Sequence, residues 1–130
     1  MELRTSLMNL SRLSPKVQAG VESLQQQFGQ EPLPLTLLAG QIGSELALLW
    51  GTAAENNAVE LLRRTEELLS VASTEDADVI CTGLLEALWN KVSLDPILRI
   101  RVHKAMGTHC QAYCRAWDEF NGIKHPDLQD

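Results

Sequence analysis

The sequence predicts an all-α protein, either an up-down helical bundle or a stack of helical hairpins, with about five helices. Apolar residues recur at spacings of three and four along the 130-residue chain, and no stretch alternates apolar and polar residues as a half-buried strand would. Proline after serine or aspartate marks helix starts, and single glycines mark helix ends. A chain of this length, with 45% hydrophobic residues, is expected to form one core.

The first half of the chain predicts two helices after an N-terminal arm or short helix within residues 1–13. Ser14 followed by Pro15 is typical of a helix start, and Gly29 is typical of a helix end. A proline-containing linker then precedes a helix over residues 35–50. Two glycines inside that helix each cost about 1 kcal/mol relative to alanine, which indicates a close approach of another helix or a local irregularity. They are Gly40 and Gly43.

The second half predicts three longer helices, over residues 58–72, 75–92 and 96–120. Short connections between them favour antiparallel neighbours. Residues 1–122 are therefore expected to form a single helical domain, followed by a loose tail over residues 123–130. The expected apolar face of the last helix consists of Leu98, Val102, Ala105, Met106, His109, Ala112, Tyr113, Ala116 and Phe120.

The charge is unevenly distributed along the chain, whose formal net charge is −6. Residues 45–90 carry nine carboxylates against Arg63 and Arg64, a net charge of −7, whereas residues 91–117 have a net charge of +4. Two explanations fit this pattern. The charges can be solvated helix faces that attract one another, or they can form an acidic surface that attracts a basic partner. The net negative charge opposes binding to nucleic acid.

The start of the sequence shows no apolar run typical of a signal peptide or a membrane span, so we expect a cytoplasmic protein that does not insert into membranes. Cys81, Cys110 and Cys114 are an odd number of cysteines in such a chain, which favours reduced thiols over a disulfide framework. The thiols agree with a reducing compartment.

No arrangement of residues predicts catalysis, a cofactor or a metal ion. His103, Cys110 and Cys114 would share a face of the last helix, but a structural zinc site needs four ligands and the fourth is missing. His109 falls in the expected apolar face, where a core or interface role is favoured over that of a base. Glycine-rich phosphate loops are also missing from the sequence. We therefore expect a protein that is not an enzyme.

A DNA-binding helix-turn-helix is disfavoured as well. Residues 37–43 loosely match the small residue and glycine of its turn, but residues 45–50 then read Glu-Leu-Ala-Leu-Leu-Trp. A recognition helix needs polar and basic side chains at those positions to contact base edges. A regulator that binds DNA is thus a weaker interpretation than a protein that binds another protein.

Residues 56–92 resemble a bacterial family of small, acidic, helical proteins that are found near polymorphic toxins and are regarded as immunity proteins. The shared pattern is a helix that ends in Glu-x-Leu-Leu, an acidic turn, and a helix with glycine and Leu-Glu-x-Leu. In this chain the pattern corresponds to residues 66–69, to residues 75 and 76, and to residues 83–88.

The resemblance implies a cytoplasmic protein that binds and neutralises a secreted toxin or effector. We expect the interface on the exposed sides of the two helices around the acidic turn, where carboxylates would attract a basic toxin and an exposed tryptophan would anchor it. The alternative for Trp89 is that it covers the edge of the core. The expected partner-binding residues are Glu60, Glu66, Glu67, Asp76, Asp78, Glu86 and Trp89. The alternative is a homo-oligomerising scaffold or regulatory adaptor, in which the acidic middle of one chain meets the basic last helix of another. The chain alone would be a monomer or a homodimer.

Overall fold

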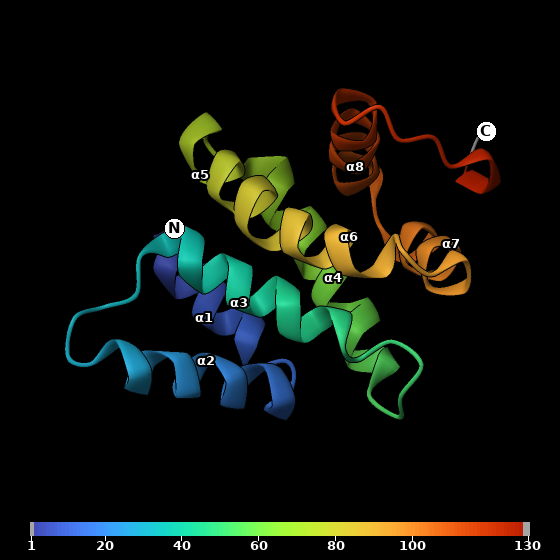
Figure 1. Ribbon diagram of the computed structural model, residues 1–130. Coiled ribbons are helices and arrows are strands. Elements are labelled where there is room, and N and C mark those ends of the chain that lie inside the picture. Colours follow the sequence, from blue (N-terminus) through green and yellow to red (C-terminus); the bar gives the residue numbers. More distant parts are fainter. Residues whose placement is uncertain (1, 129–130) are drawn as a thin grey trace.

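The computed structural model describes residues 2–128, which fold into helices without any strand (Figure 1), so the predicted all-α class is confirmed. Met1 and residues 129 and 130 of the expected tail lie outside the described residues. The helices are α1 (Leu3–Ser11), α2 (Pro15–Phe28), α3 (Leu35–Ala47), α4 (Glu55–Val71), α5 (Thr74–Val79), the π-helical segment η1 (Ile80–Leu85), α6 (Glu86–Val92), α7 (Pro96–Ala105) and α8 (Thr108–Phe120). A short 3-10 turn, η2 (Pro126–Leu128), follows.

The prediction of about five helices was too low, because α5, η1 and α6 form one continuous helix and the described chain then holds seven. One addition is α1, since the N-terminal arm is a helix whose Leu3, Leu7 and Leu10 are buried. The other comes from the predicted last helix, which the structure divides into α7 and α8.

The division falls at Met106 and Gly107, whose backbones are extended with ψ values of 143° and −178°. It changes which side of the chain faces the core, so the predicted apolar face was wrong beyond this point. His109 is exposed and Phe120 is 87% exposed. The side chains of α8 that are buried are Cys110, Cys114 and Asp118.

The predicted helix starts and ends are confirmed where a side chain or glycine marks them. Ser14 Oγ accepts a hydrogen bond from the Val17 amide at 3.3 Å, and Asp95 Oδ1 accepts one from the Ile97 amide at 2.9 Å. Gly29 has a φ of 91°, which favours glycine because a Cβ crowds the backbone there.

The core is centred on the contact between α3 and the continuous helix that runs through α5, η1 and α6, which lie side by side in Figure 1. The two helices approach closely because small residues meet along their contact. A Cβ built on Gly43 would lie 2.1 Å from the Leu84 carbonyl oxygen, and a Cβ on Gly83 would lie 2.7 Å from the Ala39 Cβ. The close approach predicted from the glycines of α3 is thus confirmed for Gly43.

The π-helical segment is buried between α3 on one side and α8 on the other. A π turn accommodates one more residue than an α turn, so residues after it present a rotated face. The effect is that Leu84, Leu85, Leu88 and Trp89 are all buried.

Among the described residues no helix combines the length and apolarity that a membrane span requires.

Replacing Gly43 with alanine should lower the free energy of unfolding by about 3 kcal/mol, because the added methyl group would push α3 away from the backbone of the π-helical segment. Gly40→Ala is the matched control on the same helix. A Cβ there meets nothing nearer than 3.9 Å, so the variant should gain about 0.5–1 kcal/mol from its higher helix propensity. Urea unfolding of both variants measures the difference, and equal stabilities would contradict the proposed contact.

Candidate functional site

The candidate binding surface is an apolar groove between α1 and α4 that continues to the start of α5. Its larger part has a volume of about 510 Å³, and a smaller part of about 110 Å³ adjoins it through Ser6, Leu68 and Val71. Its apolar lining is Leu3, Leu10, Leu13, Leu68, Val71 and Ile80, and its polar lining includes Asn9, Arg64, Glu67 and Asp76.

Helix α4 supplies one wall of the groove because its sequence has two apolar faces. The first face, with Leu61, Leu62 and Leu69, is buried in the core. The second face carries Leu68 and Val71, which lie three residues apart. Val71 remains 82% exposed, whereas Leu68 is half-buried against the core, so the apolar surface left open on this side of α4 is that of Val71.

Charged side chains of α4 surround the groove and bind one another. Arg64 Nε lies 3.1 Å from Glu60 Oε1, and Arg63 bridges Glu60 and Glu67. Hydrogen bonds from Arg63 and Arg64 lower the pKa of Glu60 to about 2. The Glu60 carboxylate is therefore charged at any pH in a cell.

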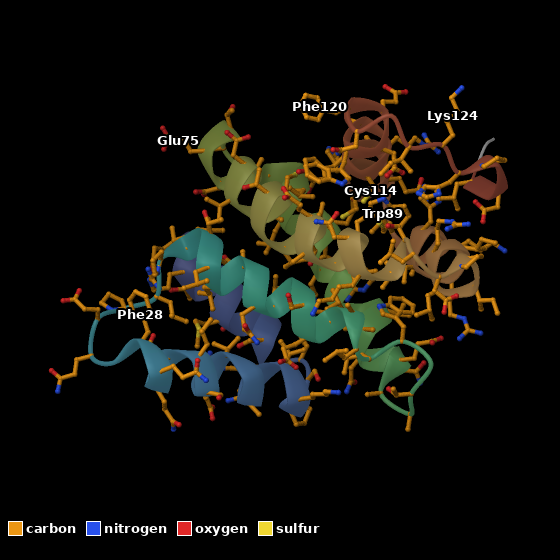
Figure 2. The ribbon with its side chains drawn as sticks, viewed as in Figure 1. Phe28, Glu75, Trp89, Cys114, Phe120 and Lys124 are labelled. Atoms are coloured by element: carbon orange, nitrogen blue, oxygen red, sulfur yellow. The ribbon has the colours of Figure 1, made fainter. Side chains whose placement is uncertain are left out.

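At the α5 end the groove meets carboxylates that have no basic side chain beside them in the described chain. Asp76 lines the groove, and its backbone amide donates to Ser73 Oγ at 3.1 Å. Figure 2 shows Glu75 at the same end, pointing away from the ribbon. Asp78 is two residues on, about 200° around the helix, so it does not face the groove. It is exposed on another side of α5.

Glu66, which was predicted to contact a partner, instead binds the N-terminus of α8 within the same chain. Its two carboxylate oxygens each accept a backbone hydrogen bond at 3.0 Å, Oε2 from His109 and Oε1 from Cys110. The His109 ring also contacts Glu66 through Nδ1. Gly107 is required beside this cap, since a Cβ there would lie 2.3 Å from Glu66 Cγ.

Burial raises the pKa of Glu66, but the hydrogen bonds from the Cys110 and His109 amides outweigh that effect and leave the pKa below its ordinary value. The charged form of Glu66 is thus the form that holds α8 against α4. The helix dipole at the N-terminus of α8 acts in the same direction.

For Trp89 the sequence left open a place at the edge of the core or an exposed anchor, and the structure contradicts the anchor, because Trp89 is 1% exposed. Its indole Nε1 donates a hydrogen bond to Asp118 Oδ1 at 3.0 Å, and Trp89 is labelled in Figure 2. The prediction failed because the π-helical segment turns Trp89 toward α8. Glu86, on the same helix, is half-buried and interacts with Tyr113 of α8.

A second hollow of about 550 Å³ lies between α7, α8 and the segment that was expected to be loose. That segment contacts the helices, because Asp127 forms an ion pair of 2.8 Å with Arg99 and His125 lies 3.5 Å from Asp118. Positive and negative side chains both line the hollow. They indicate no single class of ligand.

Metal binding and thiol chemistry find no support in the described residues. No group of three or more His, Cys, Asp or Glu in residues 2–128 is placed to hold a metal ion. Burial raises the pKa of the Cys81 thiol to about 11 and raises those of Cys110 and Cys114 further. Such thiols are protonated at neutral pH and are weak nucleophiles.

Comparison of the chain with protein-family models, with curated proteins and with solved structures found no match. The candidate site is therefore identified from the geometry of the groove alone. Sequence reasoning identified Glu60, Glu67 and Asp76 near it but missed the part of α1. The spacing of Leu3, Leu10 and Leu13 contains that signal, since it continues one helical face over the whole arm.

Glu66→Gln should cost about 1–2 kcal/mol of unfolding free energy at pH 7, because a charged cap of α8 is lost. The pKa of Glu66 in the folded chain is below its ordinary value of 4.5. The stability that Glu66 contributes is therefore complete above about pH 5 and is lost as the pH falls through the folded-state pKa. Wild type and variant should converge in acid.

The matched control is Glu67→Gln, one residue along the same helix. Glu67 is exposed and pairs with Arg63, so its loss should cost less than about 0.5 kcal/mol. Urea unfolding of both variants between pH 3 and pH 7 is the measurement. A Glu66→Gln variant as stable as wild type at pH 7 would refute the role of Glu66 as a cap.

Proposed function

We propose that the protein is a protein-binding module, and specifically an immunity protein that binds and neutralises a bacterial toxin in the cytoplasm. The observation that carries the proposal is the apolar groove between α1 and α4 with carboxylates beside it. A well-packed helical scaffold presents this surface without needing to fold on binding, which lowers the cost of association. The assignment to immunity proteins is supported by the family resemblance of residues 56–92.

Acidic charge beside the groove suits a basic toxin. Residues 60–78 carry six carboxylates against two arginines, a net charge of −4, of which Glu67 and Asp76 line the groove, while Glu66 binds α8 and Asp78 faces away from it. Such a surface accelerates encounter with a positively charged partner, and the effect weakens as salt rises. Rapid binding is useful to a cell that must block a toxin before it acts.

A homo-oligomerising scaffold is the second candidate, favoured by a different surface. Leu94 is 83% exposed and Ile97 is 70% exposed at the start of α7, in a region that also carries Arg101, which pairs with Glu55 at 3.1 Å, and the exposed Lys104. An apolar surface with basic neighbours on one copy would complement the acidic groove on another. Such a contact joins unlike surfaces, so it would build rings or open chains.

Affinity purification of the tagged chain from the cells that produce it tests the main proposal. We expect a copurifying protein that stops growth when it is expressed alone and is harmless when the chain is expressed with it. The complex should form more slowly as salt is raised, because the steering charges are screened. Light scattering of the free chain should give the mass of a monomer.

Two outcomes would contradict the proposal. One is a copurifying protein that is harmless when expressed without the chain. The other is a free chain that forms stable oligomers whose mass falls at high salt, which supports the scaffold. A variant with Glu67 and Asp76 replaced by glutamine tests the electrostatic steering. Its complex should form more slowly than that of wild type, and its fold should be kept because neither side chain binds another helix.

A further inference from the structure

The groove between α1 and α4 has the length of a short helix. Its α1 wall runs from Leu3 to Leu10, a rise of about 10 Å in an α-helix, and Leu13, just after the end of α1, extends it. Two to three turns of a partner helix have a comparable length at about 5.4 Å per turn. The wall on the α4 side presents Leu68 and Val71 at the spacing of one helical turn, which suits side chains that repeat every three or four residues.

The exposure of the groove favours a macromolecule over a small ligand. Small-molecule sites enclose most of the ligand surface. Val71 is 82% exposed, and Leu13 and Leu68 are partly buried, so the apolar walls form an open trough. A trough of this kind fits the apolar face of an amphipathic helix, whose opposite face stays in water.

The charges at the groove define the partner further. Glu67 and Asp76 line it. Glu60 and Glu67 pair with Arg63 and with the lining residue Arg64, so these four charges offset one another, and Asp76 is the carboxylate of the lining without a basic side chain beside it in the described residues. Arg12 lies at the other end, where it donates to the lining residue Asn9. The carboxylates near α5 therefore attract lysine or arginine on the helix that enters.

We propose that this groove binds an amphipathic helix of a partner protein, with apolar side chains between α1 and α4 and basic side chains facing Asp76 at the α5 end. The inference rests on the proposed function that the chain binds another protein, and it names the mode of binding. Apolar contacts with Leu13, Leu68 and Val71 supply affinity, and the carboxylates select the sign of the partner's charge.

The test uses two fluorescein-labelled peptides of about 14 residues, the length at which a peptide helix becomes marginally stable. Both have leucines at spacings of three and four. One has lysine at the flanking positions and the other has glutamate. Fluorescence anisotropy measures the affinity of each peptide for the full chain and for two variants, Val71→Asp and Leu94→Asp.

Val71→Asp removes apolar contact while adding a charge that attracts the lysine peptide, so a loss of affinity reports on the apolar groove and not on charge. The loss should be at least about tenfold. Leu94→Asp is the matched control, since Leu94 is equally exposed but lies at the start of α7, and it should stay within about twofold of wild type. Val71→Gln, which places no charge at the end of α4, should also weaken binding.

The glutamate peptide should bind at least about tenfold more weakly than the lysine peptide, and added salt should narrow the difference. The inference is overturned if Val71→Asp binds the lysine peptide as wild type does, if the glutamate peptide binds equally well, or if the lysine peptide does not bind. It is also overturned if light scattering shows a dimer that Val71→Asp dissociates, because a second copy then occupies the groove.

Failure of this inference and failure of the proposed function are distinguishable. If the chain neutralises a toxin but the peptides do not bind in the groove, the toxin binds another surface of the chain. If the lysine peptide binds as expected but the copurifying protein is harmless, the groove is a helix-binding site with a different purpose.

Discussion

The contact between α3 and the π-helical segment holds the fold together. Gly43 and Gly83 let two backbones come so near that a single methyl group at Gly43 would overlap the Leu84 carbonyl group. Around this contact, α1 and α2 pack against α3 and α8 packs against the π-helical segment, while α4 packs against α8 and α1. Gly43, which weakens α3 as an isolated helix, is therefore a residue that allows its packing.

The sequence predicts the class and most helix boundaries because those depend on neighbours within one turn. Ser14, Asp95 and Gly29 act on the residues beside them, and each behaves as expected. Trp89 shows where such reasoning ends. A constant 100° per residue places it off the core, but the preceding π turn rotates it, and its partner Asp118 lies 29 residues away. Neither fact is contained in a local pattern.

The division between α7 and α8 has a similar cause. Residues 96–120 contain one glycine, Gly107, which a long helix could tolerate at a cost of about 1 kcal/mol. The chain breaks there because Glu66, 41 positions earlier, occupies the space beside Gly107 and binds the amides of His109 and Cys110. A carboxylate that sequence reasoning assigns to the surface thus starts a helix, and its exposed neighbour Glu67 does not.

The groove lies where α1 runs beside the C-terminal half of α4. Leu3, Ser6 and Leu10 of α1 line it opposite Leu68 and Val71 of α4. Leu3 and Leu10 are buried and Leu68 is half-buried against the core, so Val71 is the apolar groove residue of α4 that stays exposed, at 82%. The groove is thus what remains between two helices that both direct their leucines into the core.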